Sequence, residues 1–483
     1  MVTTSPRLGE FEILLQGQRV PTGDTFEVRS PFDGSLVATV HRAGAAEIER
    51  AIAAADRAFA VTKQLPSWKR AAVLDWTAAA VAARRDELAE TIALEAGKPI
   101  RLARVEVDRA VFVLRTGAEE AKRIGGEILP IDWLPGTEGR EALVRRVPLG
   151  PIAGITPFNF PLNLVAHKAA PAIAAGNPII LRPGPRTPVS ALKLGQIILD
   201  AGWPPDALAV FPCSNDDTLR LVEDERIRLL TFTGSAPVGW MLKARAGRKR
   251  VTLELGGNAA VIVHADANVD YAAERIAMGG FAYAGQSCIS AQRIYVHASI
   301  YDGFAAALVA RARALALGDP LDESKDVGPV IDDAAADRIG EWIEEARGAG
   351  ARVLTGGTRH GTMWEPTVIE GAPASVRVNC REVFAPLVSL IRYEDVAAAI
   401  AAANDSEFGL QAAVFTYDQR VVDAAVAGID AGGIIVNDSS AFRVDHMPYG
   451  GVKQSGFGRE GLRYAIEEMT ELKLVLYNRA AAT

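Results

Sequence analysis

The sequence predicts an α/β protein with two domains of this class. The chain has 483 residues, and a single hydrophobic core tends to split into domains above roughly 250–300 residues. From Val147 onward, short apolar runs alternate with longer helical ones, which is the pattern of parallel βαβ units in a doubly wound sheet. A second series of apolar runs begins at Ala260 and is long enough for a second α/β domain.

The first third of the chain is rich in alanine and is predicted to be helical. Residues 43–61 and 67–97 space alanine, leucine and isoleucine among Glu, Arg and Asp, as amphipathic helices require. Gly97-Lys98-Pro99 ends the second segment, because glycine favours the position after a helix and proline cannot continue one. We interpret these helices as scaffold.

Strands and helices are then expected to alternate. The first region has predicted strands at residues 152–156, 179–181, 208–211 and 229–232, and predicted helices at residues 162–175, 189–201, 218–224 and 238–246. The second region has strand candidates at residues 260–263, 293–296, 352–354 and 433–436.

A short hairpin is predicted to leave the first domain at residues 127–147. The C-terminal segment 472–477 is another short apolar strand and is the candidate partner of this hairpin. A second subunit often covers exposed sheet edges of this kind, so we expect a homodimer or a homotetramer.

Composition is typical of a globular enzyme. Hydrophobic residues make up 49% and charged residues 23%, which is too apolar for a disordered chain. The formal net charge of −7 argues against a nucleic-acid binder, which would carry a basic surplus. The longest apolar stretch, residues 165–181, is interrupted by polar side chains, so no membrane span is expected.

The cysteines indicate a reducing compartment. They are Cys213, Cys288 and Cys380. Three cysteines cannot build a disulfide framework, and neither they nor the six histidines have the spacing of a metal site. The N-terminus lacks the apolar core of a signal peptide. We therefore expect a cytoplasmic enzyme without a bound metal.

A candidate phosphate site follows an apolar strand. Residues 231–239 read Thr-Phe-Thr-Gly-Ser-Ala-Pro-Val-Gly and open a helix. Glycine permits close approach of the backbone and a helix N-terminus offers free N–H groups to an anion, so a pyrophosphate suits Gly234 and Ser235. The alternative is a plain turn with Ser235 as N-cap. The Gly-x-Gly-x-x-Gly fingerprint is absent, so the motif alone is weak.

Two residues are candidates for covalent catalysis. Cys288 lies in a small polar setting, Ala-Gly-Gln-Ser-Cys, and Glu254 lies at the end of an apolar strand, before a Gly-Gly turn. A thiol can act as a nucleophile, and partial burial would raise the pKa of a carboxylate towards that of a general base. The alternatives are a cysteine packed as a small hydrophobe and an exposed glutamate at a strand end.

Asn159 is a candidate oxyanion donor. It lies in Phe158-Asn159-Phe160-Pro161, and an amide in a tight turn can donate a hydrogen bond to a developing negative charge. The alternative is that asparagine occurs there because it tolerates turn conformations.

Six motifs then occur in one order along nearly the whole chain. They are Phe-Asn-Phe-Pro at 158–161, Phe-Thr-Gly-Ser at 232–235, Glu-Leu-Gly-Gly at 254–257, Gly-Gln-Ser-Cys at 285–288, Glu-Val-Phe-Ala-Pro at 382–386 and Pro-Tyr-Gly-Gly-Val-Lys-x-Ser-Gly at 448–456. Together they resemble the aldehyde dehydrogenase superfamily. Residues 442–451 and 464–470 are most similar to the branch of lactaldehyde, non-phosphorylating glyceraldehyde-3-phosphate and phosphonoacetaldehyde dehydrogenases.

The resemblance implies oxidation of an aldehyde to a carboxylic acid with NAD or NADP. Cys288 would attack the aldehyde, Asn159 and the Cys288 backbone N–H would hold the oxyanion, and Glu254 would activate the water that hydrolyses the thioester. The implied cofactor contacts are Thr156, Pro157, Phe158, Arg182, Gly234, Ser235, Gly256, Glu382 and Phe384.

The resemblance also implies a domain layout. A Rossmann-like cofactor-binding domain would comprise residues 1–126 and 148–255. A second, catalytic α/β domain would comprise residues 256–454, and a small oligomerisation β-hairpin segment would comprise residues 127–147 and 470–483.

The sequence departs from the family at two positions that bear on the cofactor. Arg182 stands where a lysine is usual, and Pro185 replaces a glutamate that commonly binds the adenosine ribose, with Arg186 adjacent. Loss of the carboxylate removes repulsion against a 2′-phosphate, and nearby arginines can pair with one. We predict that NADP is accepted, without excluding NAD. The alternative is that both arginines face solvent.

The substrate is expected to be a small polar aldehyde. By the same resemblance, Arg443 would bind a hydroxyl, carboxylate or phosphonate of the substrate, and Ser287, before the nucleophile, would line the same site. Some anion-binding relatives carry arginine at the Ser287 position, which weakens the case for a phosphorylated substrate. Arg101 and Arg104 are candidates for further contacts, and a surface role is the alternative for both.

Other functions remain open at this point. A coenzyme-A-acylating dehydrogenase would use the same thiol, but that branch typically lacks the base that Glu254 supplies. A cofactor-independent thiol esterase and a catalytically silent binding protein are the remaining alternatives, and the joint presence of Cys288, Glu254 and Asn159 argues against the silent one.

Overall fold

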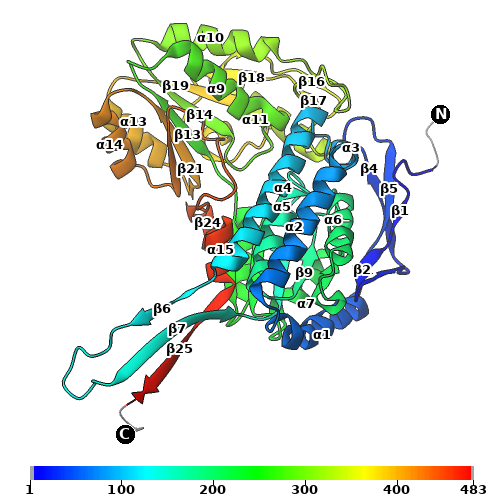
Figure 1. Cartoon of the computed structure of the whole chain (residues 1–483). Helices are drawn as coiled ribbons and strands as arrows, with labels where there is room; N and C mark the ends of the chain where they lie inside the picture. The colour runs from blue at the N-terminus through cyan, green and yellow to red at the C-terminus, as the bar shows by residue number, and fades with distance from the viewer. Residues whose placement is uncertain (1–4, 480–483) are drawn as a thin grey trace.

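Two sheets, each flanked by helices, organise the computed structural model, which describes residues 5–479 (Figure 1). The first is an eight-stranded sheet and the second a seven-stranded sheet. A three-stranded arm projects from the body of the molecule (Figure 1). The predicted α/β class with two such regions is confirmed.

Parallel strands form the centre of the first sheet. In spatial order they are β12 (Arg250–Glu254), β11 (Leu229–Thr233), β8 (Ile152–Ile155), β9 (Ile179–Arg182) and β10 (Leu208–Val210). β9 follows β8 on one side, whereas β11 lies on the other side of β8, so the strand order reverses between β8 and β11. Ligands bind beyond the carboxyl ends of strands at such a switch point.

Antiparallel strands extend this sheet at its edges. β2 (Ile13–Leu15) pairs with β10 and with β3 (Gln18–Val20), and β24 (Gly456–Phe457) pairs with β12. A separate sheet of β1 (Glu10–Phe11), β5 (Leu36–His41) and β4 (Thr25–Arg29) precedes the first helix. The prediction of a helical first third is therefore wrong before α1. The reason is visible in Thr25–Arg29, where apolar and polar residues alternate with the period of a strand.

Most helices of the first region lie close to their predicted bounds. They are α1 (Ala45–Thr62), α5 (Asn163–Ala175), α6 (Val189–Asp200), α7 (Asn215–Glu223) and α8 (Ala236–Arg245). α7 begins earlier than predicted, because Ser214 Oγ accepts the backbone N–H of Asp217 at 3.0 Å and caps the helix.

The predicted helix at residues 67–97 is two helices. α2 (Ser67–Ala83) and α3 (Arg85–Ala96) meet at Arg84, whose backbone leaves the helical region at φ −106° and ψ 24°. The long helix α4 (Ile100–Arg123) follows and packs against α2 and α5. Within residues 5–479, no helix combines the length and the apolar character needed to cross a membrane.

The second sheet is parallel except at one edge. Its strands, in spatial order, are β15 (Arg352–Thr355), β18 (Thr367–Glu370), β19 (Leu387–Tyr393), β14 (Ala291–His297), β13 (Ala259–Val263), β21 (Gln411–Phe415) and β22 (Gly433–Val436). β15 is antiparallel to β18. The four predicted strand segments are present, and β18, β19 and β21 are strands that the sequence reading missed.

Helices cover both faces of this second sheet (Figure 1). α9 (Val269–Phe281) and α10 (Tyr301–Ala314) pack on one face, and α13 (Val396–Asn404) and α14 (Gln419–Gly428) on the other. α11 (Asp333–Gly348) packs beside β18. Successive residues of β13 point to opposite faces and are buried on both, as strands covered on two sides require.

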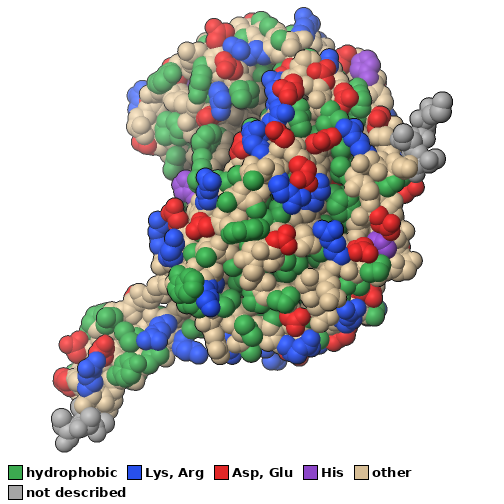
Figure 2. Space-filling view, turned by 45° about the vertical axis from the view of Figure 1, so that its right-hand side comes forward, with side chains coloured by type: hydrophobic (Ala, Val, Ile, Leu, Met, Phe, Trp, Pro, Cys, Tyr) green, Lys and Arg blue, Asp and Glu red, His purple; other side chains and the backbone are tan. Residues whose placement is uncertain are grey.

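The arm consists of β6 (Gly126–Leu129), β7 (Arg140–Pro148) and β25 (Thr470–Asn478). β7 pairs antiparallel with both neighbours, so the predicted hairpin and its pairing with residues 472–477 are confirmed. The predicted oligomerisation segment also includes residues 480–483, which lie outside the described residues. Apolar side chains are exposed on the arm (Figure 2), among them Ile128, Leu472, Leu474 and Leu476.

Candidate active site

A cavity of about 510 Å³ is lined by residues from both regions. The first region contributes the segments that follow β8, β11 and β12, and the second contributes the segments before β14 and β19. The predicted site residues that line it are Pro157, Phe158, Asn159, Gly234, Ser235, Glu254, Gly256, Ser287, Cys288, Glu382, Phe384 and Arg443. Thr156 and Arg182 do not line it.

A left-handed turn precedes the candidate nucleophile. Tyr283, Ala284 and Gly285 have φ angles of 51°, 53° and 67°. Such angles are unfavourable for residues with a Cβ. Tyr283 Oη donates to the Ala96 carbonyl at 3.0 Å, which ties the turn to the end of α3.

Cys288 follows this turn and borders the cavity. Its Sγ lies 2.9 Å from Tyr449 Oη. Burial raises the pKa of the Cys288 thiol to about 12, although Tyr449 and the guanidinium of Arg443 act in the opposite direction. The side chain is only partly buried and lines a cavity, so a purely packed cysteine, the alternative from sequence, does not describe it.

Glu254 ends β12 and is 4% exposed. Its Oε2 has no hydrogen-bond partner among the described residues. Burial, reinforced by the Glu460 carboxylate, raises the pKa of Glu254 well above its usual range. The alternative of an exposed glutamate at a strand end is wrong, and a raised pKa is what a general base near neutral pH requires.

Asn159 is buried in the turn between β8 and α5. Its Nδ2 donates to the Gln286 carbonyl at 3.0 Å, which lies in the loop that carries Cys288. An amide nitrogen carries two hydrogens, so one remains for a further acceptor. The hydrogen bond joins the turn of the first region to the nucleophile loop of the second.

Glu382 and two glycines shape another part of the cavity. Glu382 Oε1 accepts the backbone N–H of Gly257 at 3.0 Å, and a Cβ at Gly256 would lie 2.4 Å from Oε2. Burial raises the pKa of Glu382 to about 7. The rings of Phe158 and Phe384 meet edge to face with centroids 6.0 Å apart. A carboxylate beside aromatic rings fits a ligand with hydroxyl groups and a flat ring.

The N-terminus of α8 fits a phosphate group. Ser235 occupies the N-cap position, as the plain-turn alternative expects, but its side chain makes no capping hydrogen bond. A Cβ at Gly234 would lie 2.5 Å from the Phe232 ring, so a larger residue there would displace that ring. Free N–H groups at the positive end of a helix bind anions. Together with Glu382, these residues fit a dinucleotide.

The two arginines considered for the cofactor lie outside the cavity. Arg182 is buried, and its Nη2 donates to the Cys213 carbonyl at 3.2 Å and to Asn215 Oδ1 at 3.0 Å. Arg186 is exposed and pairs with Asp332 at 2.9 Å. The solvent-facing alternative is therefore right for Arg186 and wrong for Arg182.

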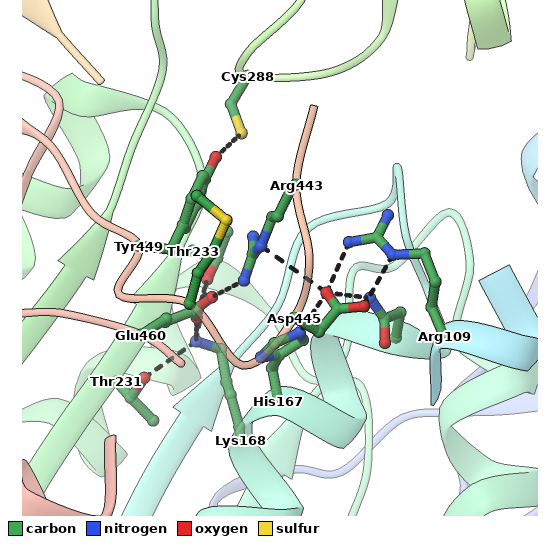
Figure 3. A network of polar contacts seen from close by, with 12 residues as sticks. Arg109, His167, Lys168, Thr231, Thr233, Cys288, Arg443, Asp445, Tyr449 and Glu460 are labelled. Carbon is green, nitrogen blue, oxygen red and sulfur yellow. Dashed lines mark hydrogen bonds and ion pairs between the residues drawn. The ribbon is translucent and has the colours of Figure 1, made fainter. Parts of the chain in front are cut away.

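A charged network borders Cys288 (Figure 3). The Arg443 side chain is 8% exposed, and its Nη2 donates to Glu460 at 3.2 Å. Its guanidinium lies over the Tyr449 ring, 3.6 Å from the centroid. Lys168 Nζ lies 3.5 Å from the same Glu460 carboxylate. Arg443 thus lines the cavity, as predicted, but its charge is balanced by a buried acid.

A second acid, Asp445, anchors the other half of this network (Figure 3). It pairs with Arg109 at 2.6 Å and with His167 at 2.9 Å. These contacts, with the charges of Arg109 and His167, hold the pKa of Asp445 below its usual range despite its burial. Arg109 also lines the cavity. His167 is buried.

Several residues of this site were missed by the sequence reading. They are Arg109, Lys168, Tyr449 and Glu460. Tyr449 lies within the predicted motif at 448–456, so a signal was present, whereas Arg109 and Glu460 belong to no motif and meet only through the fold. Arg101 and Arg104 lie outside the cavity, where they pair with Asp326 and Asp86.

Residues 19–475 match the family model described as "Aldehyde dehydrogenase family". The chain belongs to this family. The predicted family, fold class and NAD(P)-dependent dehydrogenase activity are therefore confirmed.

The chain is similar over nearly its whole length to characterised aldehyde dehydrogenases. It is 42% identical to 3-sulfolactaldehyde dehydrogenase of Priestia aryabhattai over 99% of this chain and 100% of that protein. Aldehyde dehydrogenase 21 of Physcomitrella patens, solved with the reaction product succinate, is 41% identical over 99% of this chain and 100% of that one, with a TM-score of 0.97.

A third relative belongs to the predicted branch. Glyceraldehyde-3-phosphate dehydrogenase GapN of Methanocaldococcus jannaschii, solved with NADP, is 37% identical over 95% of this chain and 100% of that one, with a TM-score of 0.91. The predicted resemblance of the C-terminal motif to this branch is confirmed.

Proposed function

We propose that this aldehyde dehydrogenase oxidises a small aldehyde with an anionic substituent to a carboxylic acid, through a thioester on Cys288. The observation that carries the proposal is that Cys288, Asn159 and the buried Glu254 line one cavity. These side chains supply a nucleophile, an oxyanion donor and a base, which are the groups that acyl transfer through a covalent intermediate requires.

The first step is attack on the aldehyde. The Cys288 thiol gives its proton to Glu254, whose raised pKa makes it a competent base. The thiolate forms a bond to the carbonyl carbon, and the π electrons of the carbonyl move to its oxygen. Asn159 Nδ2 and the Cys288 backbone N–H donate to this oxyanion.

Oxidation then converts the thiohemiacetal to a thioester. NAD(P)⁺, when bound, supplies the acceptor for the hydride that leaves the tetrahedral carbon. Glu382 and Phe384 would hold the nicotinamide ribose, and Gly234 and Ser235 the pyrophosphate. Pro157, Phe158 and Gly256 line the same cavity and are further proposed contacts, whereas Thr156 and Arg182, which the resemblance implied, lie outside it.

Hydrolysis completes the cycle. Glu254 first releases to solvent the proton that it took from the Cys288 thiol. It then takes a proton from a water molecule, and the resulting hydroxide attacks the thioester carbon. The tetrahedral intermediate expels the Cys288 sulfur, which regains a proton from Glu254, and the carboxylic acid leaves. Glu254 therefore serves as the base twice, which argues against transfer of the acyl group to coenzyme A.

Two guanidinium groups support an anionic substrate. Arg443 and Arg109 line the cavity together with Ser287. Arg109 uses Nε and Nη2 to bind Asp445, and its Nη1 makes no hydrogen bond within the described residues. The relative solved with succinate and the relative named for sulfolactaldehyde both handle anionic compounds. We assign the anionic end of the substrate to Arg109 and Arg443.

We propose that NADP is accepted as well as NAD. Pro185 leaves no carboxylate at its position to repel a 2′-phosphate, and the GapN relative was solved with NADP. The burial of Arg182 leaves Arg186 as the exposed guanidinium nearby. We expect kcat/KM with NADP to lie within about tenfold of that with NAD, and a strong preference for NAD would contradict this.

We further propose that residues 1–126 and 148–255 form the cofactor-binding domain and residues 256–454 the catalytic domain. Residues 127–147 and 470–483 would form an oligomerisation segment in a homodimer or homotetramer. Separate sheets and the exposed apolar arm support this division. Three free cysteines support a cytoplasmic enzyme.

An aldehyde panel tests the proposed function. Lactaldehyde, succinic semialdehyde, phosphonoacetaldehyde and a neutral aldehyde of similar length are incubated with NAD and with NADP, and NAD(P)H absorbance is followed. We expect reduction, with higher kcat/KM for the anionic aldehydes, and a loss of roughly 10³-fold or more in Cys288→Ser. Ester cleavage without reduction of cofactor would instead establish a thiol esterase, and acyl-coenzyme-A formation an acylating enzyme.

A further inference from the structure

Lys98 and Glu106 form a buried ion pair that the proposed chemistry does not use. Lys98 lies between α3 and α4, Glu106 lies on α4, and each is 1% exposed. Neither lines the cavity. Removing two charges from water costs more free energy than their attraction returns unless further interactions complete the pair. The other partners of these side chains therefore indicate what the pair holds in place.

Glu106 caps α5 from a neighbouring helix. Its Oε1 accepts the backbone N–H groups of Leu162 at 2.9 Å and of Asn163 at 3.1 Å. The N-cap residue of α5, Leu162, has no capping side chain of its own. A carboxylate satisfies donors that a helix N-terminus leaves free and matches its dipole. Since these N–H groups follow directly after Asn159-Phe160-Pro161, Glu106 fixes the helix end to which the Asn159 turn is attached.

Lys98 contacts both turns of the active site. Its Nζ lies 3.7 Å from the centroid of the Phe160 ring and 4.4 Å from that of the Tyr283 ring. The two rings also meet edge to face, with centroids 6.3 Å apart. A desolvated cation over aromatic faces is strongly attracted. Phe160 is adjacent to Asn159, and Tyr283 begins the left-handed turn before Cys288, so one ammonium group joins the two turns.

We infer that Lys98 and Glu106 are positioning residues, which hold the Asn159 amide and the Cys288 loop in the relative position that attack on the aldehyde requires. The inference rests on the roles proposed above for Asn159 and Cys288. Reactions of this kind depend steeply on placement, since a shift of about 1 Å can cost roughly 10²-fold in rate. The hydrogen bond from Asn159 to Gln286 joins the same two segments, the Asn159 turn and the Cys288 loop.

The test replaces the pair by apolar side chains of similar size, in Lys98→Met/Glu106→Leu. We expect kcat, at saturating aldehyde and cofactor, to fall about ten- to hundredfold, while KM for the aldehyde changes less than about threefold. Glu106→Asp keeps the charge but shortens its reach, and it supplies a milder variant with a smaller loss of the same kind. Melting temperatures are recorded for both.

Glu95 provides the matched control. It is equally buried, and it caps α6 by accepting the N–H groups of Val189 at 2.8 Å and Ser190 at 3.0 Å, away from the cavity. Glu95→Gln should lower the melting temperature and leave kcat within about twofold of the wild type. The comparison distinguishes an effect on stability, from loss of a buried helix cap, from an effect on kcat, from displacement of the Asn159 turn and the Cys288 loop.

The Lys98→Met/Glu106→Leu change in an Asn159→Ala background tests whether the pair affects kcat through the position of Asn159. Because one of the two turns that the pair holds carries Asn159, the further loss of kcat there should be smaller than the loss in the wild-type background. Wild-type kcat in a folded pair variant or in Glu106→Asp, or a full loss that persists without Asn159, overturns the inference. If the wild-type enzyme reduces neither cofactor with any aldehyde, the proposed function itself fails, and that result is distinct.

Discussion

Burial stabilises the protonated forms of both Glu254 and Cys288, and this shapes the pH dependence of the enzyme. The pKa of Glu254 is raised well above its usual range, and that of Cys288 is raised to about 12. A proton must leave each group during the proposed cycle. Activity should therefore depend on a base that becomes available only at a pH above that of an ordinary carboxylate.

Removal of this base gives the first prediction. A general base acts when deprotonated, so kcat should rise with pH through the raised pKa of Glu254 rather than near the ordinary value of 4.5. Glu254→Gln should lower kcat by roughly 10²–10⁴-fold and remove this rising limb. Measurement of kcat against pH for the wild type and for Glu254→Gln tests this prediction. If kcat of the variant still rose over the same pH range, the titration would belong to another group.

Substitution of Arg109 tests the selection of anionic aldehydes. A hydrogen bond to a charged group contributes about 1.5–3 kcal/mol, so Arg109→Met should lower kcat/KM for succinic semialdehyde roughly 10- to 100-fold and have little effect on a neutral aldehyde. Arg104→Met is the control, because Arg104 lies on the same helix, outside the cavity, and pairs with Asp86 and Glu323. Equal losses for charged and neutral aldehydes would refute this role of Arg109.

The catalytic residues could be predicted from the sequence only where each lies within a recognisable motif. Cys288, Glu254 and Asn159 lie in short segments with recognisable neighbours, and all three line the cavity. Arg109 and Glu460 are ordinary charged residues of separate segments, and their ion pairs with Asp445 and Arg443 exist only after folding. A sequence pattern holds no signal for such pairs.

At the scale of elements, the left-handed turn at residues 283–285 is the most constrained segment near the nucleophile. Gly285 has φ 67°, and a Cβ there would lie 1.9 Å from the Ala385 carbonyl oxygen. Gly285→Ala should lower the free energy of unfolding by about 1–3 kcal/mol and reduce kcat, because the Cys288 loop must shift. Denaturant unfolding and steady-state assays measure the two effects.

A glycine in an open setting serves as the control for this turn. Gly303 lies in α10, and a Cβ there would meet no atom within 4 Å. Gly303→Ala should be neutral or stabilising by up to about 1 kcal/mol. A Gly285→Ala enzyme that unfolds like wild type would show that the turn tolerates a side chain.

Element types were predicted better than element limits. The alternation of apolar runs and helices located β8 to β11 and α5 to α8, because buried parallel strands are continuous apolar segments. The break at Arg84 and the early start of α7 depend on single backbone angles and one capping hydrogen bond. The strands before α1 were obscured by the helical character of the alanine-rich segment that follows.

At the scale of the whole molecule, the site depends on how the two sheets are joined. β12 ends at Glu254 and β13 begins at Ala259, so the base stands at the short crossing between them. Ser455 Oγ donates to the Gly256 carbonyl at 2.7 Å and accepts the Gly409 N–H at 2.9 Å, which fastens this crossing. The base ends a strand of the first sheet, whereas the nucleophile precedes a strand of the second, so neither segment alone shows that the two residues line one cavity.

Substitutions in the three-stranded arm test the proposed homodimer or homotetramer. Leu472 and Leu476 are 56% and 52% exposed on one face of β25, and exposed apolar strands of this kind mark interfaces. Leu472→Glu/Leu476→Glu should reduce the mass measured by light scattering to that of one chain. Trp68→Glu, at an exposed apolar residue on α2, should leave the assembly intact. A wild-type enzyme of single-chain mass would contradict the proposal.

The protonated state of Cys288 also determines how the idle enzyme withstands oxidants. Peroxide reacts with the thiolate, and the conversion of cysteine to sulfenic and then sulfinic acid follows thiolate character and exposure. A thiol whose pKa is raised to about 12 by burial should be oxidised by hydrogen peroxide no faster than free cysteine at neutral pH, as residual activity over time would show. Because the raised pKa keeps Cys288 in the thiol form, we expect the nucleophile to be protected from peroxide while no substrate is bound.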